Sequence, residues 1–192
     1  LADETQAHLL VEVDGNDENQ LFQDVAAIVD IMTSYDCGEV LFAEDASQKE
    51  MLWKLRRRVG EAVKSNSVYK EEDTVVPRYE MPRLLKGVKE IGNRYGFHSV
   101  CYGHVGDGNL HVNIVKGDLA EEVWDAELPK AIREIFELCK SLGGTISGEH
   151  GIGLVQKDYL NIVFSETEMN LQKEIKRIFD PKGILNPGKI WN

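Results

Sequence analysis

The sequence predicts an α+β fold in which helices pack on one face of an antiparallel sheet, a sandwich of ferredoxin-like character. Three observations lead to this prediction. The chain opens with the pattern strand, helix, strand, a hairpin signal lies near its middle, and segments of helical periodicity flank that hairpin. No internal repeat and no low-complexity segment interrupts this order.

The opening pattern consists of two short apolar runs around one amphipathic segment. Residues 8–13 (HLLVEV) predict a strand that ends at the turn pair Asp14-Gly15. Residues 17–35 carry apolar side chains at helical spacing and predict a helix. Gly38 then ends that helix, and residues 39–43 (EVLFA) predict a second strand.

Two further helices and an extended segment are expected next. Residues 46–63 show helical spacing, and a third helix is expected to begin near Pro82 and to end at Gly96. Between these helices, residues 68–77 are expected to be extended as far as Pro77, which has no N–H to donate to a ladder.

The last part of the chain alternates in the same way. Residues 98–102 and 110–115 are the arms of the predicted hairpin. Residues 127–142 and 166–179 predict two more amphipathic helices. The tail, residues 180–192, is too rich in proline and glycine to be regular.

Length and composition limit the classes of protein. With 192 residues, 42% of them hydrophobic, the chain can bury one substantial core, and we expect one domain over residues 1–192. The net charge of -11 argues against binding of nucleic acid or anionic membranes, which relies on surplus Lys and Arg. No apolar run approaches the roughly 18 residues that span a bilayer. Cys37, Cys101 and Cys139 lie far apart and predict buried, reduced thiols of a cytosolic protein.

Residues 103–111 (GHVGDGNLH) combine the hairpin signal with two histidines. Asp-Gly between alternating apolar segments favours a type I′ turn with Asp107 and Gly108 as its central residues. In that register His104 faces His111 on one side of the sheet, with Cβ atoms about 4.5–5.5 Å apart. This separation suits two imidazoles that share one metal ion.

Residues 145–153 (TISGEHGIG) form the second stretch with chemical potential. A catalytic zinc usually takes three protein ligands and keeps one position open, so the two histidines need a third ligand. Glu149, a carboxylate on a glycine-flanked loop, is the candidate, and His150 beside it is placed to accept a proton as a general base. Structural roles stay open: the histidines as hydrogen-bonded or surface residues, Asp107-Gly108 as a plain turn, and Glu149 as a solvated acid.

Basic and polar residues elsewhere predict how a substrate is held. One of the consecutive arginines 56–58 and Lys70 would form a clamp for a carboxylate, because guanidinium pairs with carboxylate in a bidentate manner. Ordinary solvated charge is the alternative. In the predicted hairpin register, Tyr102 and Asn113 pair on the face of the two histidines and are candidates for the lining of the same pocket.

Three motifs together resemble the C-terminal (cap) domain of FAD-linked oxidases of the vanillyl-alcohol oxidase superfamily. They are His104-x-Gly-Asp-Gly-Asn-x-His111, Gly148-Glu149-His150-Gly151 and Leu185-Asn186-Pro187-Gly188-Lys189. The likeness is greatest to the flavoprotein subunit of glycolate oxidase, to D-lactate dehydrogenase and to D-2-hydroxyglutarate dehydrogenase. Residues 9–15, 52–56 and 72–77 support it, so the resemblance covers nearly the whole chain.

The resemblance implies a flavin enzyme that oxidises a D-2-hydroxy acid of the glycolate, D-lactate or 2-hydroxyglutarate type. In relatives a divalent metal, often zinc, is held by the equivalents of His104, His111 and Glu149 and chelates the substrate carboxylate and hydroxyl. The equivalent of His150 takes the hydroxyl proton while the hydride passes to the flavin N5. The Lewis acidity of the metal would assist this proton transfer.

The resemblance also implies binding residues and partners. Arg56 and Lys70 would hold the substrate carboxylate, although three consecutive arginines leave open which of them forms the clamp. Asp73 and Asn186 would contact FAD from the cap side, and the tail 180–192 would face the flavin. An N-terminal domain that this sequence does not contain would hold most of the FAD. An iron–sulfur electron-transfer subunit is a further partner to test.

Two other functions stay open on the residues alone. One is a stand-alone metallohydrolase that uses His104, His111 and Glu149 with a bound water. The other is a non-enzymatic, ferredoxin-like binding module with structural histidines. The expected location is the cytoplasm, with peripheral association at the inner face of the membrane as the alternative. Because the first residue is leucine, we expect the chain to be the substrate-cap part of a longer enzyme.

Overall fold

The computed structural model describes residues 5–35 and 37–191, and the chain divides into two compact units, residues 1–61 and 62–192. The first unit contains helix α1 (Glu18–Thr33) and most of helix α2 (Ala46–Asn66). α1 begins after Asp17, whose carboxylate accepts hydrogen bonds from backbone N–H groups of the first turn. Both helices agree with the sequence prediction to within a turn.

The two strands predicted for the first unit are not formed. Residues 8–13 and 39–43 have neither helix nor strand structure. A strand needs a neighbour whose N–H and C=O groups complete its ladder, and within the described part of the chain neither segment has such backbone hydrogen bonds. The predicted opening strand–helix–strand motif is therefore wrong in its strands and right in its helix.

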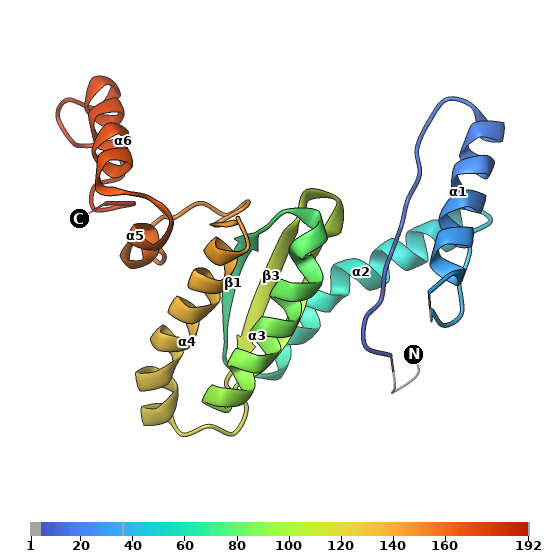
Figure 1. Cartoon of the computed structure of the whole chain (residues 1–192), viewed down its shortest axis with the longest axis horizontal. Coiled ribbons are helices and arrows are strands. Elements are labelled where there is room, and N and C mark those ends of the chain that lie inside the picture. Colours follow the sequence, from blue (N-terminus) through green and yellow to red (C-terminus); the bar gives the residue numbers. More distant parts are fainter. Residues whose placement is uncertain (1–4, 36, 192) are drawn as a thin grey trace. The chain divides into compact units, whose positions relative to one another are not determined.

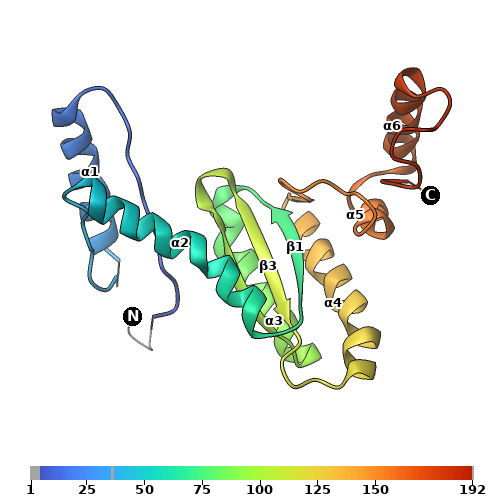
Figure 2. The ribbon, with the colours of Figure 1, turned by 180° about the vertical axis from the view of Figure 1, so that it is seen from behind.

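The second unit is built around a four-stranded antiparallel sheet with strand order β2-β3-β1-β4 (Figures 1 and 2). Its strands are β1 (Tyr69–Val75), β2 (His98–His104), β3 (Asn109–Val115) and β4 (Thr145–Ile146). Helix α3 (Met81–Tyr95) contacts β2 and β3, and helix α4 (Glu121–Ser141) contacts β1 and β4. Both helices cover the same face of the sheet, which confirms the predicted α+β class.

The hydrophobic core lies between this sheet and α3 and α4. Alternate residues of β3 point to opposite faces. Leu110, Val112 and Ile114 belong to the core, whereas Asn109, His111 and Asn113 lie on the other face and are also buried. Leu84 of α3 and Phe136 of α4 are fully buried against the apolar face. The face of the sheet away from the helices is therefore the polar one, and it carries His111.

Helix boundaries follow local signals where these are strong. α3 has Pro82 in its first turn and ends at Gly96, which has φ 75°, and helix α6 (Glu166–Phe179) has the predicted bounds. α4 begins six residues before its predicted start at 127. Its early turn is anchored by Trp124, which is buried and packs edge-on against Phe97 with ring centroids 5.4 Å apart.

The remaining general features concern thiols, surface and tail. All three cysteines are free, and Cys139 is buried, but Cys37 is exposed, contrary to the prediction.

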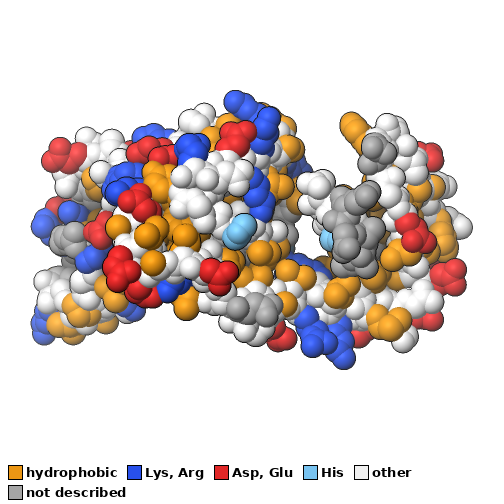
Figure 3. All heavy atoms as spheres, turned by 90° about the horizontal axis from the view of Figure 1, so that it is seen from below, with side chains coloured by type: hydrophobic (Ala, Val, Ile, Leu, Met, Phe, Trp, Pro, Cys, Tyr) orange, Lys and Arg blue, Asp and Glu red, His pale blue; other side chains and the backbone are white. Residues whose placement is uncertain are grey.

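Acidic and basic side chains are interspersed over the face that Figure 3 shows. Among residues 5–35 and 37–191, no helix is both long and apolar enough to cross a bilayer. Residues 180–191 form turns without helix or strand, and Asn192 lies outside the described residues.

Candidate functional site

The hairpin β2–β3 is present, but its register differs from the predicted one by two residues. His104 pairs with Asn109 rather than with His111. Residues Val105–Asp107 form a single 3₁₀ turn, η2, and Gly108 follows with φ 72°. This longer loop replaces the predicted two-residue turn. Because a shift of two residues preserves the alternation of side chains, His104 and His111 still share one face.

The three predicted metal ligands converge on this face. His104 Nε2 lies 3.8 Å from Glu149 Oε1, and His111 Nε2 lies 3.8 Å from Glu149 Oε2. One donor atom of each residue lies within 4.8 Å of the others. Tetrahedral zinc with nitrogen and oxygen ligands holds those atoms about 3.3–3.5 Å apart. The group therefore fits such an ion once the donor atoms, which lie within 4.8 Å of one another, move closer together.

Electrostatics favour the neutral form of His111. Burial lowers the pKa of His111, although the neighbouring carboxylates Asp73 and Glu149 oppose this shift. A neutral imidazole is the form that binds a metal ion. His111 is 5% exposed, while His104 and Glu149 are exposed. The candidate metal site thus has one buried ligand and two ligands at the surface.

His150, the predicted base, lies directly beside these ligands. Its ring stacks on His111, with centroids 4.9 Å apart and an interplanar angle of 17°. His150 is exposed, so a substrate that reaches the ligands from solvent also meets this imidazole. The arrangement can therefore combine Lewis-acid and general-base chemistry at one surface.

Asp73 holds the loop that carries Glu149 and His150. Its Oδ2 accepts hydrogen bonds from the backbone N–H groups of Glu149 (2.6 Å) and His150 (2.9 Å), and its Oδ1 accepts one from Asn109 Nδ2 (2.6 Å). The Asp73 carbonyl also accepts a bond from the Ser147 N–H at 2.9 Å. Burial alone raises the pKa of Asp73, but the three hydrogen bonds to its carboxylate outweigh burial and lower that pKa. The loop is thus fixed through its backbone.

The far end of this loop is tied to the opposite face of β1. Gln156 Nε2 donates a hydrogen bond to Glu72 Oε2 at 2.8 Å, and both residues are buried. Burial raises the pKa of Glu72 despite the nearby Lys70 ammonium. Consecutive carboxylates of β1 therefore anchor both ends of the segment between β4 and the short helix η3 (Lys157–Tyr159).

Comparison with known proteins shows the family to which the chain belongs. Residues 1–190 match the family model described as FAD linked oxidases, C-terminal domain. The chain belongs to this family. The resemblance seen in the sequence is thereby confirmed.

Three curated relatives illustrate the similarity. The chain is 33% identical over 188 residues to D-lactate dehydrogenase of Anaerostipes hadrus (97% of the chain, 40% of the relative). It is 33% identical to D-2-hydroxyglutarate dehydrogenase of Stutzerimonas stutzeri (96% and 40%). It is 34% identical to glycolate oxidase subunit GlcD of Bacillus subtilis (97% and 39%). The chain therefore spans about two fifths of the length of these relatives.

The other predicted residues of this FAD-linked oxidase domain are placed unevenly. Asn113 shares the face of His111, whereas Lys70 pairs with Ile114 and lies on the opposite face, with its Nζ 3.2 Å from Glu72 Oε1. Arg56 belongs to the first unit. Asn186 lies in the tail, where its Oδ1 accepts a hydrogen bond from Lys189 Nζ at 3.1 Å. Substrate contacts of Arg56, Lys70 and Asn113, and flavin contacts of Asp73 and Asn186, stay predictions.

The predicted pair of Tyr102 and Asn113 is also corrected. Tyr102 pairs with His111 and Asn113 with Val100, and the Tyr102 and His111 rings are 5.7 Å apart between centroids. All of these residues remain on the polar face because the register shift is even. Asn113 is fully buried there.

Two site residues, Asn109 and Glu71, are absent from the sequence prediction. Asn109 holds the Asp73 carboxylate, and Glu71 Oε1 lies 3.8 Å from His111 Nδ1. Strand parity was a usable signal for Glu71, because residues two apart on a strand share a face and Asp73 was already a candidate. The same parity applies to Asn109, which lies two residues from His111 on β3.

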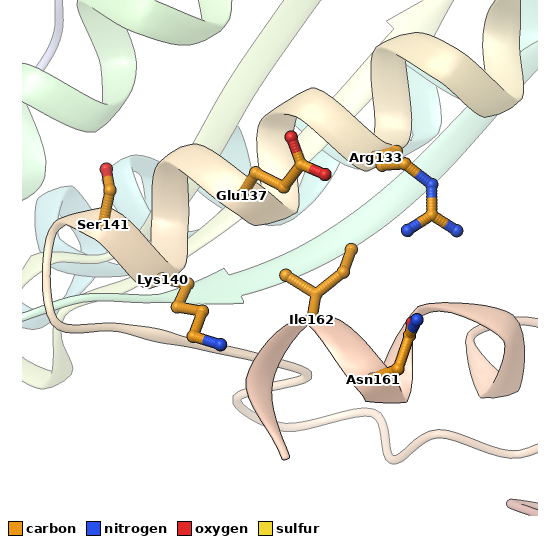
Figure 4. Close-up of a pocket in the computed structure, with 6 residues that line it drawn as sticks. All are labelled: Arg133, Glu137, Lys140, Ser141, Asn161 and Ile162. Carbon is orange, nitrogen blue, oxygen red and sulfur yellow. The ribbon is translucent and has the colours of Figure 1, made fainter. Parts of the chain in front are cut away.

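A separate hollow of about 500 Å³ lies between α4 and the short helix α5 (Leu160–Val163) (Figure 4). Its lining residues are Arg133, Glu137, Lys140, Ser141, Asn161 and Ile162. None of these is a predicted site residue. The Arg133 guanidinium is already placed over the Tyr159 ring, 5.5 Å from its centroid. The chemistry that the sequence predicts is therefore on the sheet face and not in this hollow.

Replacement of Gly148 by alanine is expected to disturb the loop anchor. A Cβ at Gly148 would lie 2.6 Å from Asn109 Nδ2 and 3.2 Å from Val75 Cβ, so the bond from Asn109 to Asp73 must shift. Overpacking of this kind costs about 1–3 kcal/mol. Urea unfolding measures the loss. Gly106→Ala is the matched control, since nothing lies within 4 Å of its Cβ position; equal stability of the two variants would contradict the prediction.

Proposed function

We propose that this chain is the substrate-binding cap of an FAD-dependent dehydrogenase that oxidises a D-2-hydroxy acid. The observation that carries the proposal is the convergence of donor atoms from His104, His111 and Glu149, with His150 stacked beside them. The names of the relatives point to D-lactate, D-2-hydroxyglutarate and glycolate as substrates of those proteins. A small acid with a carboxylate next to a hydroxyl is the common chemistry.

We further propose that the three ligands hold a divalent metal, with zinc as the ion of choice, because two imidazoles and a carboxylate are typical zinc ligands. When bound, this metal acts as a Lewis acid that lowers the pKa of the substrate hydroxyl. The buried, neutral His111 supplies a preorganised nitrogen, and the surface positions of His104 and Glu149 leave the site open to solvent.

The residues of this chain bind and deprotonate the substrate in this proposal. His150 accepts the hydroxyl proton, and its stacking on His111 orients the ring. Asp73 keeps the backbone of His150 in place through the hydrogen bond at 2.9 Å. FAD, when bound mainly by a domain that precedes this chain, supplies the hydride acceptor. An iron–sulfur partner subunit and a cytoplasmic location complete the proposal.

The test uses the full-length protein that includes the flavin domain. D-lactate, glycolate or D-2-hydroxyglutarate should reduce the FAD, followed as loss of flavin absorbance. Loss of a general base slows a reaction about 10²–10⁴-fold, so His150→Ala should slow flavin reduction by that factor and leave the metal content unchanged. His98→Ala, at an exposed histidine of β2, is the control. Flavin reduction at the parent rate in His150→Ala would contradict the proposal.

A further inference from the structure

Glu71 is a carboxylate of the site face to which the mechanism above assigns no part. We propose that Glu71 orients His111 by accepting a hydrogen bond from its Nδ1–H. This is a positioning role, and it rests on the proposed metal site because it concerns the ring that presents Nε2 to the ion. The argument begins with the proton of His111.

The location of that proton follows from the geometry. His111 Nε2 faces Glu149 at 3.8 Å and belongs to the candidate ligand group. A neutral imidazole carries one N–H, so if Nε2 offers its lone pair to the metal, the proton sits on Nδ1. Nδ1 is buried and has no hydrogen-bond partner among the described residues. A buried donor of this kind calls for an acceptor nearby.

Two carboxylates flank Nδ1, and hydrogen bonds hold only one of them, Asp73, in place. Asp73 Oδ1 lies 3.7 Å away and Glu71 Oε1 3.8 Å away. Both oxygens of Asp73 are already engaged, by Asn109 and by two loop N–H groups. Within residues 5–35 and 37–191, no hydrogen bond to the Glu71 carboxylate is found, and its side chain is 23% exposed. The long Glu71 side chain can therefore move into hydrogen-bond distance of His111 Nδ1, whereas Asp73 is held in place by its own hydrogen bonds.

Asn113 gives independent support. It lies directly opposite Glu71 in the register of β1 and β3, where Cβ atoms are about 4.5–5.5 Å apart. Its amide is fully buried, and neither Nδ2 nor Oδ1 has a partner among the described residues. A carboxylate has two oxygens, so Glu71 can accept from His111 Nδ1–H with one and from Asn113 Nδ2 with the other. One side chain thus accounts for two buried donors without acceptors.

The consequence for the metal is specific. A histidine ligand whose second nitrogen donates to a carboxylate is fixed in tautomer and orientation and becomes a stronger ligand. Loss of such an outer partner typically lowers metal affinity about 10–100-fold. Glu71 is expected to act at this level, without contact with the ion.

The first measurement is zinc affinity of the 192-residue chain, by competition with a chromophoric chelator at one pH. Glu71→Met, which keeps the length of the side chain and removes the acceptor, should weaken zinc binding about 10–100-fold. Glu71→Gln keeps an acceptor oxygen and should retain most of the affinity. Glu90→Met removes an exposed carboxylate from α3 and should leave the affinity unchanged. Circular dichroism checks that each variant is folded.

The second measurement needs no metal. Nitrogen-15 NMR of the metal-free chain should show His111 with its proton on Nδ1, and Glu71→Met should shift the proton towards Nε2. A parent chain protonated on Nε2, unchanged zinc affinity in Glu71→Met, or equal losses in Glu71→Met and Glu71→Gln would each overturn the role of Glu71. If the parent chain binds no zinc, the metal part of the proposed function fails, and the NMR result still decides the role of Glu71.

Discussion

Replacement of His111 by alanine is expected to abolish metal binding by this chain. His111 belongs to both groups of converging donor atoms, one with His104 and Glu149 and the other with Glu71 and His150. Without it, one exposed histidine and one exposed carboxylate remain of the proposed ligands. Because loss of an outer-shell partner already lowers metal affinity about 10–100-fold, loss of a buried ligand should exceed about 100-fold.

The measurement is zinc titration of the metal-free chain, followed by flavin reduction in the full-length protein. His98→Ala is the control, because His98 is exposed at the start of β2. His98→Ala should bind zinc like the parent and support flavin reduction at the parent rate. Zinc binding of parental strength in His111→Ala would show that the ligand set is wrong, even if flavin reduction is impaired.

Replacement of Asp73 by alanine is expected to be the most destabilising change in the site. It removes the acceptor of three hydrogen bonds, at 2.6, 2.6 and 2.9 Å. The change leaves the buried Asn109 amide and two part-buried N–H groups without this acceptor. A buried donor left without a partner costs about 1–3 kcal/mol, so the free energy of unfolding should fall by about 3 kcal/mol once the two part-buried donors are included. Since Glu149 and His150 lose their anchor, zinc affinity should fall as well. Urea unfolding and zinc titration of the same sample measure the two effects.

The effect of Asp73 should also depend on pH. The pKa of Asp73 is lower in the folded protein than in the unfolded chain. Its stabilising contribution is therefore complete above the unfolded pKa of about 3.9, and it is lost as the pH falls through the lower folded pKa. The difference in unfolding free energy between parent and Asp73→Asn should shrink over this range. A difference that stays constant from neutral pH down to about pH 3 would contradict this account.

Elements with local signals were predictable from the sequence. The third helix follows from Pro82 in its first turn and Gly96 at its end, and the last helix begins after Ser165, which forms a capping box with Glu168. Residues 8–13 and 39–43 have suitable strand composition, but composition does not supply a pairing partner. β4, with two residues, exists because Thr74 and Val75 are there to pair with it, and so short an element has no periodicity to detect.

The hairpin shows where local rules end. Asp107-Gly108 predicted a two-residue turn, but the loop contacts a distant segment. The Val76 N–H donates to the Gly108 carbonyl at 3.0 Å, and a Cβ at Gly108 would overlap the Val76 carbonyl oxygen. Val76, the partner in this contact, lies outside residues 103–111, so the hairpin register could not be predicted from those residues alone. The placement of the two histidines on one face depends only on the parity of the register, and for that reason it was predictable.

Some residues of the candidate site were likewise predictable from the sequence, and others were not. Side-chain chemistry and glycine spacing pointed to His104, His111, Glu149 and His150, which the structure brings together. Lys70 is an odd number of residues from Asp73, so strand parity places the two on opposite faces, as the register shows. The anchoring of the loop by Asp73 was not predictable, because backbone N–H groups donate whatever the residue and leave no mark in the sequence.

The hydrogen bonds to Asp73 fix the backbone of the loop independently of the side chains that the loop carries. Asp73 grips residues 149 and 150 by their main chain, so neither the carboxylate of Glu149 nor the imidazole of His150 is needed to shape the loop. The side chains at these two positions can therefore be replaced without loss of the hydrogen bonds that hold the loop backbone. Substitutions at these two positions are therefore expected to change the proposed ligand and the proposed base while the hydrogen bonds from the loop backbone to Asp73 are kept.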